Sequence, residues 1–550
     1  MKKIVIVLVL IFGFFSCKNS KENKTPEVQS YKIPHLVKKG IRTQFVVEDQ
    51  PFLILGGELG NSTASTMESM ETVWTKLKAM NLNTVLVPIY WELFELEEGK
   101  FDYKLIDDLI EEARNQDLKI IFLWFASWKN SMSSHVPSWV KNDDVRFPRV
   151  KDDNGISQEI LTPLSENNLQ ADLVAFEALM THIKMVDEYE QTVIMMQPEN
   201  EIGMLPVARD YSDLANQKFN EEVPEAFINY LVENKEKLVP EFYSVWEENG
   251  FKTSGNWEAI FGKGTHTDEI FMAWYFAQYT NKIIEAGKEI YPLPMFVNAA
   301  LNRPNREPGK GYPSAGPLPH IMDVWFAGGK SIGFLAPDFY FPNIKHWSDL
   351  YTRQENPLFI PEHRFDNTVG PKALFTIGHY ESLGFSPFSI ESKEDSENEP
   401  LGKAYHLINQ LSPLISSLKG THKMNGVLLD KANPETKITL GDYEFTFRHS
   451  HTLGWEAASK NDVWEDAGAL IIQTKDNEFF VAGTGIVVTF KSVINPSTNV
   501  GILKVDKGEF KNNEWKVIRH LNGDQTHQGR HLRIFNGDYE IQKLELYTYN

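Results

Sequence analysis

Residues 83–125 read NTVLVPIYWELFELEEGKFDYKLIDDLIEEARNQDLKIIFLWF, with an apolar run at each end and a helical pattern between them. The runs, 83–90 and 119–125, are short and uninterrupted, as in strands that are buried on both faces. Between them, apolar residues recur every three or four positions over 105–116, which predicts an amphipathic helix. A strand, a helix and a second strand in this order predict two parallel strands joined by a right-handed crossover.

The same alternation continues on both sides of this unit. Six more apolar runs begin near residues 52, 192, 295, 332, 358 and 385. Eight strands that alternate with helices favour a (β/α)8 TIM barrel over an open doubly wound sheet. The first strand is not followed by the glycine-rich turn of a dinucleotide fold. After about residue 437 the apolar period falls to two, which predicts a smaller all-β, sandwich-like domain. The fold class is therefore α/β, with a β-sandwich at the C-terminal end.

These patterns divide the chain into five parts. We expect a lipoprotein signal peptide at 1–16, a lipidated cysteine with a polar tether at 17–32, the barrel at 33–400, a connecting helix at 401–420 and the all-β domain at 421–550.

The first 17 residues predict an anchor. Two lysines precede the apolar run 4–15, which is too short to span a bilayer core of about 30 Å as a helix. Ser16 and Cys17 follow, and a small residue before a cysteine at this place resembles a bacterial lipobox. The alternative is an ordinary secretory signal with an incidental cysteine. We expect a protein of the cell envelope, lipid-anchored at Cys17 on the periplasmic side or on the outer-membrane surface.

Composition limits the possible partners and cofactors. The 550 residues include 55 Lys+Arg and 75 Asp+Glu, a net charge of −20, which disfavours nucleic acid as a partner. A single cysteine cannot form an internal disulfide or a cysteine-rich zinc site. The histidines show no metal-binding spacing, so we expect no catalytic metal and no cofactor.

Polar residues follow the predicted strands, and the carboxyl ends of barrel strands are where active sites form. They include Glu58, Trp91, Trp128, Lys129, Glu199, Asn200, Glu201, Asn298, Asp338, Tyr340 and Glu362. Carboxylates, amides and aromatic rings on one rim suit a neutral, hydroxyl-rich ligand such as a carbohydrate. Trp91 and Trp128 are candidate platforms for stacking on sugar rings, although each tryptophan could equally belong to the core.

Glu201 and Glu362, after strands four and seven, supply the two carboxyl groups that glycoside hydrolysis needs. One protonates the leaving oxygen, and the other attacks the anomeric carbon or activates a water molecule. With 75 acidic residues, some follow apolar runs by chance, so spacing alone leaves an incidental pair open.

The motifs MMQPENEIG (195–203) and LFIPEHRF (358–365), together with IFLWFASWKNS and FLAPDFYFP, resemble glycoside hydrolase family 35. The likeness is to the bacterial β-galactosidase branch of this family, within the clan A barrel glycosidases. The later stretch GALIIQTKDNEFFVAGTGIVVTF resembles the uncharacterised β-domain that follows the barrel in that branch. His363–Arg364, directly after the second motif, departs from better-known members and bears on the wall around the sugar.

The resemblance implies a retaining, exo-acting β-galactosidase that cleaves terminal β-galactosides by double displacement. It implies Glu201 as acid/base, an ionised Glu362 as nucleophile, and Tyr340 as the hydrogen-bond donor to that nucleophile. Glu58, Glu199 and Asn200 are the expected ligands of sugar hydroxyls. Two alternatives stay open: another retaining clan A glycosidase, such as a β-glucosidase or a marine-galactan hydrolase, and a glycan-binding lipoprotein without turnover.

Overall fold

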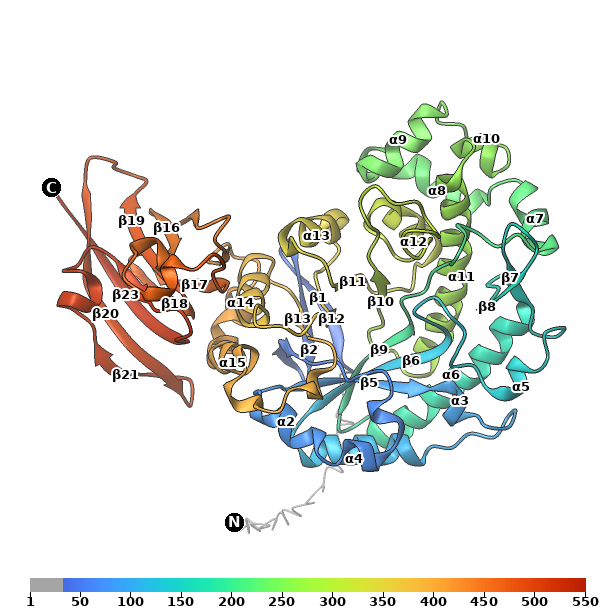
Figure 1. The fold of residues 1–550 in the computed structure, drawn as a ribbon, viewed down its shortest axis with the longest axis horizontal. Helices are drawn as coiled ribbons and strands as arrows, with labels where there is room; N and C mark the ends of the chain where they lie inside the picture. Colours follow the sequence, from blue (N-terminus) through green and yellow to red (C-terminus); the bar gives the residue numbers. More distant parts are fainter. Residues whose placement is uncertain (1–32) are drawn as a thin grey trace, which may run out of the picture. The chain divides into compact units, whose positions relative to one another are not determined.

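Eight parallel strand segments follow one another along the chain in the predicted order (Figure 1). The computed structural model describes residues 33–550, which form one unit. The segments are β4 (Ile54–Leu55), β5 (Thr84–Tyr90), β6 (Lys119–Lys129), β9 (Val193–Asn200), β10 (Val297–Ala300), β11 (Leu335–Phe339), β12 (Glu362–His363) and β13 (Gly384–Phe385). Ladders join β5–β6–β9, β10–β11–β12 and β13–β4, all of them parallel.

Single parallel bridges connect these ladders. Met196 pairs with Met295, Ile360 with Phe385, and Glu58 with both Leu86 and Phe388. Neighbouring strands therefore lie side by side in the order of a (β/α)8 fold, with no continuous ladder around them. The carboxyl ends of all eight strands point to one face, as the sequence analysis requires.

Helices follow the strands on the outside. They include α2 (Val73–Ala79), α4 (Lys104–Asn115), α6 (Glu166–Asp187), α11 (Thr265–Ile290), α12 (Met322–Gly328), α13 (Ile344–Tyr351), α14 (Val369–His379) and α15 (Pro400–Leu418). Four short helices lie between β9 and α11: α7 (Asp213–Asn220), α8 (Glu225–Glu233), α9 (Pro240–Glu248) and α10 (Trp257–Phe261). Among the described residues, no helix is both long and apolar enough to cross a bilayer.

A small antiparallel sheet precedes the first barrel strand, and the sequence analysis did not anticipate it. Its strands are β1 (His35–Lys39), β2 (Arg42–Val47) and β3 (Gln50–Phe52). Phe45 and Val47 of β2 share a core cluster with inward-facing residues near the amino ends of the barrel strands, among them Ile121, Phe334 and Phe359. The sheet therefore packs over the barrel end opposite the strand ends expected to carry the chemistry.

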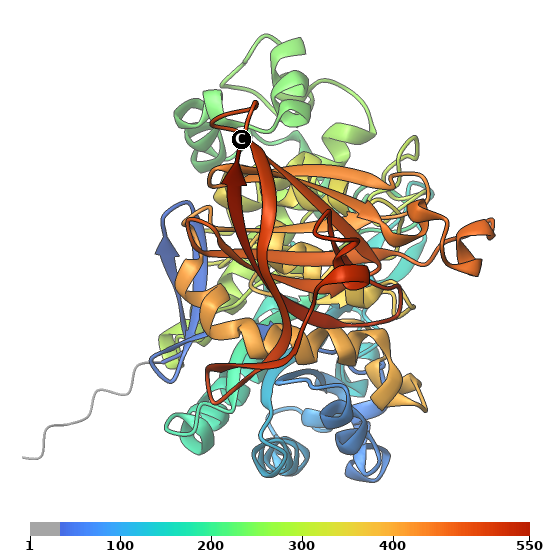
Figure 2. The ribbon, with the colours of Figure 1, turned by 90° about the vertical axis from the view of Figure 1, so that its left-hand side faces the viewer.

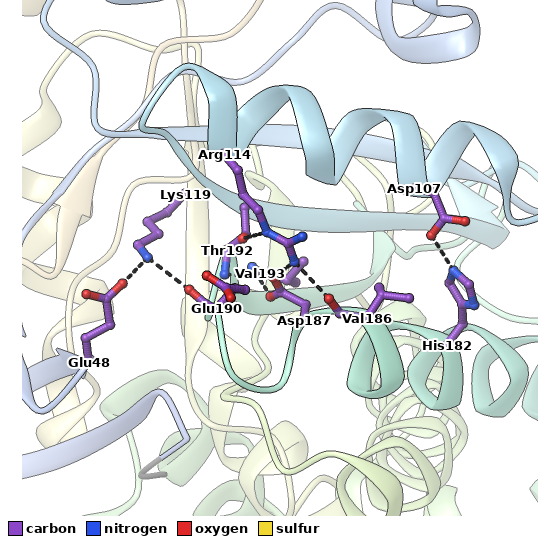
Figure 3. A network of polar contacts seen from close by, with 10 residues as sticks. All are labelled: Glu48, Asp107, Arg114, Lys119, His182, Val186, Asp187, Glu190, Thr192 and Val193. Carbon is purple, nitrogen blue, oxygen red and sulfur yellow. Dashed lines mark hydrogen bonds and ion pairs between the residues drawn. The ribbon is translucent and has the colours of Figure 1, made fainter.

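A polar network fixes the start of β9, the strand that leads to Glu201 (Figure 3). Asp187, the last residue of α6, accepts hydrogen bonds from Arg114 (2.6 Å), from the Thr192 amide (3.0 Å) and from the Val193 amide (2.6 Å). The Asp187 side chain is fully buried, whereas the Arg114 side chain is about a third exposed. One carboxylate therefore joins α4, α6 and β9 at the barrel's amino end.

The C-terminal part forms two antiparallel sheets packed face to face, as the period of two predicts. One has six strands, in the order β14 (Met424–Leu429), β17 (Ala467–Lys475), β18 (Glu478–Thr484), β23 (Glu540–Tyr549), β20 (Asn499–Lys511) and β21 (Glu514–His520). The other has four: β15 (Glu435–Leu440), β16 (Tyr443–His449), β19 (Ile486–Ser492) and β22 (Leu532–Ile534).

Side chains alternate between two cores along the six-stranded sheet. On β17, Ile471 points into the sandwich core, whereas Leu470 and Ile472 belong to the barrel core. Figure 1 shows α14 and α15 between the barrel strands and these sheets, and in Figure 2 the C-terminal strands (orange to red) lie in front of the barrel. The barrel helices and the β-sandwich thus share one apolar interface.

Candidate active site

A cavity of about 410 Å³ opens at the carboxyl ends of β9, β10, β11 and β12. Its charged lining residues are Lys129, Glu201, Arg303, Asp338, Glu362 and Arg364. Asn61, Asn130, Leu301, Pro313, Tyr340, Phe341 and Phe388 complete most of the wall. The cavity is therefore polar and charged, with aromatic rings near its rim.

Three carboxyl groups meet at the floor of this cavity. One oxygen each from Glu201, Asp338 and Glu362 lie within 4.8 Å of one another. All three residues are buried, with 5%, 1% and 3% exposure respectively. Retaining glycosidases hold their two carboxyl groups about 5–5.5 Å apart, whereas inverting enzymes need about 6.5–9.5 Å for a water molecule. The close approach of Glu201 and Glu362 fits the retaining arrangement.

An unusual backbone directs the residues at the end of β9. Glu199 and Glu201 both have left-handed conformations, with φ of 63° and 45°, which non-glycine residues adopt rarely and often at functional sites. The amide of Glu201 donates to Asn298 Oδ1 (3.0 Å), and Asn298 Nδ2 donates to Asp338 (2.8 Å). Asn298 therefore ties the backbone of Glu201 to β11.

Glu201 and Glu362 each have a neighbouring hydrogen-bond donor. Asn130 donates its amide hydrogen to Glu201 Oε2. The hydroxyl of Tyr340 donates to Glu362 Oε1, the contact that the sequence resemblance implied. These bonds leave Glu362 Oε2 without a hydrogen-bond partner in the described part of the protein, so this oxygen is free to contact a ligand.

Burial and like charge set the electrostatics of the floor. Burial, and then the charge of Glu201, raise the pKa of Glu362 to about 7, against the opposing effects of the Lys129 charge and the Tyr340 hydrogen bond. Burial, and then the charge of Glu362, raise the pKa of both Glu58 and Asp338 well above the usual range. Burial and the neighbouring charge therefore favour partial protonation of Glu362 near neutral pH, whereas the sequence resemblance implied an ionised nucleophile.

Several buried polar atoms around the floor have no hydrogen-bond partner among residues 33–550. They are Glu58 Oε1, Asn200 Nδ2, Asp338 Oδ1 and Glu362 Oε2. Buried polar groups in native proteins are nearly always paired, so a cluster of open ones calls for a ligand. Asn200 is held through its other atom, Oδ1, which accepts from Lys129 Nζ (2.9 Å). The set offers donors and acceptors that suit sugar hydroxyls.

Glu199 lies elsewhere, although the sequence analysis expected it among the sugar ligands. Its Oε2 atom accepts from the Trp128 amide (2.7 Å), and its carboxyl group lies beside Asp172 of α6, behind the strand. In a regular strand Glu199 and Glu201 would share a face. The left-handed residues break that alternation, so Glu201 faces the cavity and Glu199 does not.

The two tryptophans expected as stacking platforms are core residues. Trp91 is fully buried, packs against Trp124 and Trp139, and donates its ring N–H to Glu95 (2.7 Å). Trp128 is fully buried against Phe276 and Tyr279 of α11. Neither residue lines the cavity, because their side chains point into the helical layer rather than towards the strand-end face.

His363 is packed rather than exposed to a ligand. Its ring lies against Phe339 and Phe385, and its Nδ1 atom is 2.6 Å from the Arg364 carbonyl oxygen. Burial lowers the pKa of His363 to about 3, so the ring is neutral and supports the wall behind Glu362.

The sequence analysis assigned no role to several residues that the structure brings into the site. Lys129, Asn298 and Asp338 were marked only by their position after a predicted strand. Arg364 was expected near the wall around the sugar, whereas Arg303, on the loop after β10, was not predicted, and nothing in the residue pattern showed that both loops turn towards the same cavity.

By distance alone, the oxygens of Glu201, Asp338 and Glu362 could ligate a hard divalent cation. The absence of a catalytic metal stays a prediction. Cys17, the predicted lipidation site, lies outside the described residues.

Residues 62–249 match the family model described as beta-galactosidase, that of glycoside hydrolase family 42. Residues 401–533 match a domain of unknown function. The first match contains Glu201 and ends before Glu362. It supports a clan A glycoside hydrolase of the β-galactosidase type, but it does not support the narrower family 35 assignment. A comparison with curated protein sequences found no match.

Solved structures similar to this chain are distant. The beta-galactosidase from Bacillus circulans sp. alkalophilus is 12% identical, with a TM-score of 0.45, 66% of this chain covered and 57% of that one. The catalytic domain of beta-amylase from Paenibacillus polymyxa is 13% identical, with a TM-score of 0.45 and coverage of 64% and 97%. The beta-mannanase from the blue mussel Mytilus edulis is 14% identical, with a TM-score of 0.40 and coverage of 68% and 96%. The chain thus spans just over half the length of the first of these structures.

Proposed function

We propose that this protein is a retaining, exo-acting β-galactosidase that removes terminal β-galactosyl groups from a carbohydrate. The observation that carries the proposal is the pair Glu201 and Glu362, whose oxygens approach within 4.8 Å at the floor of the strand-end cavity. The family-model match over residues 62–249 supports the choice of galactose. We take the eight strands to act as one closed barrel of the clan A type.

In the first step Glu362 Oε2 attacks the anomeric carbon while the bond to the leaving oxygen breaks. Glu201 gives its proton to that oxygen, and a covalent galactosyl–Glu362 ester results. Tyr340, through its hydroxyl, holds Glu362 Oε1 so that Oε2 faces the sugar. In the second step Glu201 takes a proton from water, the water oxygen attacks the anomeric carbon, and Glu362 leaves. Two inversions give net retention.

We also propose that Cys17 is lipidated and that the enzyme works in the cell envelope. The support is the apolar run 4–15 followed by Ser16–Cys17, with the only cysteine of the chain at that place. Labelling cells with a palmitate analogue checks this: the wild-type chain should carry the label, and Cys17→Ser should not. An unlabelled wild-type chain would contradict the anchor and leave the proposed activity untouched.

The test of the activity uses the full chain from residue 18 and a panel of p-nitrophenyl glycosides. We expect turnover of the β-galactoside with the β-anomer of galactose as first product by NMR. Glu362→Gln should lose more than about a thousandfold in kcat. Glu201→Ala should lose far less on the p-nitrophenyl substrate than on a β-galactosyl disaccharide, because nitrophenolate leaves without a proton.

Glu355→Gln serves as the matched control, since Glu355 is an exposed carboxylate that pairs with Lys38 away from the cavity. It should leave turnover within about twofold of wild type. Normal turnover in Glu362→Gln would refute the nucleophile assignment. The α-anomer as first product would refute double displacement.

A further inference from the structure

The rim of the catalytic cavity is basic although the protein as a whole is acidic. The net charge is −20, and the floor of the cavity holds three carboxyl groups. Yet Arg303 and Arg364 are both exposed and line the same cavity. Neither forms an ion pair with any carboxylate among residues 33–550. In a chain with twenty more acidic than basic groups, two unpaired guanidinium groups at one cavity mouth call for an explanation.

The two arginines are positioned rather than free. Arg364 follows β12 by one residue, and its Nη2 atom donates to the carbonyl oxygen of Tyr340 (3.1 Å). The guanidinium of Arg303, which follows β10, lies over the ring of Phe341 with 5.6 Å between its central carbon and the ring centroid. Tyr340 and Phe341 directly follow β11, the strand between β10 and β12. The arginines therefore flank one strand end, each held by one of its two aromatic residues.

The depth of each group fixes which part of a glycan it would meet. Glu201 and Glu362 are buried at the floor, so an exo-acting enzyme places the terminal sugar there. The next sugar, which carries the leaving oxygen, lies towards solvent, where Arg303 and Arg364 stand. Guanidinium groups match carboxylates and sulfate-type oxyanions by paired N–H donors, which lysine does not offer in fixed geometry.

We propose that Arg303 and Arg364 form a subsite for an oxyanion, a sulfate ester or a carboxylate, on the sugar next to the terminal galactose. This inference rests on the proposed function and names its substrate class, an anionic galactoside. The acidic floor repels an anion from the innermost position, and the basic rim attracts it one sugar further out. The two zones thus set the orientation in which a charged glycan enters.

The test measures binding to the full chain carrying Glu362→Gln, so that ligands are not hydrolysed. The probes are a neutral β-linked digalactoside, the same disaccharide with a 6-sulfate on its reducing-end sugar, and the form whose reducing end is galacturonic acid. Calorimetry at low salt should give at least one anionic probe about tenfold tighter binding than the neutral one. This preference should fall as ionic strength rises, because exposed charges are screened.

Substitutions then show which residues cause the tighter binding of the anionic probe. Arg303→Met and Arg364→Met should each reduce it by about threefold or more. Arg306→Met is the matched control, because Arg306 is exposed on the same loop as Arg303 but does not line the cavity. It removes the same charge and should leave the preference intact. A preference for the sulfated or for the uronic probe alone identifies which oxyanion the subsite takes.

Equal binding of neutral and anionic probes by the parent protein would overturn the subsite. An equal loss of preference in Arg306→Met would also overturn it, because general charge would then explain the effect. Hydrolysis of the neutral disaccharide by the chain with Glu362 intact, without anion preference, would leave the proposed activity standing and remove this inference. Anion-dependent binding without any hydrolysis would support the oxyanion subsite and contradict the proposed activity.

Discussion

The ionisation of Glu362 is set by neighbours that act in opposite directions. Burial and the charge of Glu201 raise its pKa to about 7, while Lys129 and the Tyr340 hydroxyl lower it. The proposed mechanism needs an ionised Glu362 for the attack, so kcat/KM should fall as pH drops through this value. Lys129 and Tyr340 can be replaced one at a time, so the effect of each on the pKa of Glu362 can be measured separately.

Tyr340→Phe should move the acid limb of the kcat/KM profile to higher pH. The hydroxyl stabilises the charged form of Glu362, so its loss raises the pKa, by about one unit if the bond is worth 1–2 kcal/mol. Lys129→Met should shift the limb the same way, because it removes a positive charge. The measurement is hydrolysis of p-nitrophenyl β-galactoside between pH 4 and 9 at constant ionic strength.

Tyr380→Phe is the control for this shift. Tyr380 also donates its hydroxyl to a carboxylate, that of Asp349 (2.6 Å), but on the helical side of the barrel. It should leave the limb in place. A limb that stays unmoved in Tyr340→Phe would mean that another group limits the reaction at low pH.

Chelation should leave the activity unchanged. Three carboxyl oxygens lie close enough to ligate a cation, yet the proposed double displacement uses only the two carboxyl groups and no metal ion. We expect turnover within about twofold of untreated enzyme after dialysis against EDTA. A loss that Mg²⁺, Ca²⁺ or Mn²⁺ restores would show that the three carboxylates act as ligands.

At the scale of elements, the apolar runs predicted the eight parallel strands because strands buried on both faces need uninterrupted apolar residues. They did not predict the sheet of β1, β2 and β3, whose residues are only half buried. Nor could they place Glu199, because the left-handed φ of 63° that turns it away from Glu201 has no sequence signature. Position after a strand located the site, and backbone conformation decided which side chains enter it.

The Asp187 network holds the start of β9, so damage there should lower the stability of the fold. Asp187→Asn removes the charge opposite Arg114 and part of the acceptor set for the amides of Thr192, just before β9, and of Val193, its first residue. We expect a loss of about 2–3 kcal/mol in the free energy of unfolding, discounted because Arg114 is a third exposed. Urea denaturation followed by tryptophan fluorescence measures it.

The comparison for this loss comes from the same network (Figure 3). Asp107 pairs with His182 at 2.6 Å, but the Asp107 side chain is 48% exposed. Asp107→Asn should therefore cost only about 0.5 kcal/mol. Equal losses in the two variants would show that burial of the Asp187 carboxylate is not what makes it important.

For the whole molecule, the decisive feature is the interface between the barrel and the β-sandwich. Leu470, Ile472, Phe480 and Ile541 of the six-stranded sheet belong to the barrel core rather than to the sandwich core. The backbones also approach closely, since a Cβ added at Gly426 would lie 2.4 Å from the Phe375 carbonyl oxygen of α14. The spacing of apolar residues along the sequence predicted two domains, because it changes from a helical to a strand pattern. Such a change says nothing about how closely the two domains pack.

The barrel should therefore not fold well without the sandwich. A chain that ends at residue 420 exposes the faces of α14 and α15 that pack against β14, β17 and β18, an apolar surface that soluble proteins rarely leave open. We expect this truncated chain to be insoluble or to bind a hydrophobic dye such as ANS strongly. In the full chain, Gly426→Val should lower the thermal midpoint by at least several degrees, because the added side chain meets the backbone of α14. Gly523→Val is the control. Gly523 lies at an exposed turn with no atom within 4 Å of an added Cβ, so this variant meets only backbone strain and should lower the midpoint less. A soluble, active protein of residues 33–420 would show that the sandwich is an accessory module, and the shared core would then contribute affinity between domains rather than folding of the barrel.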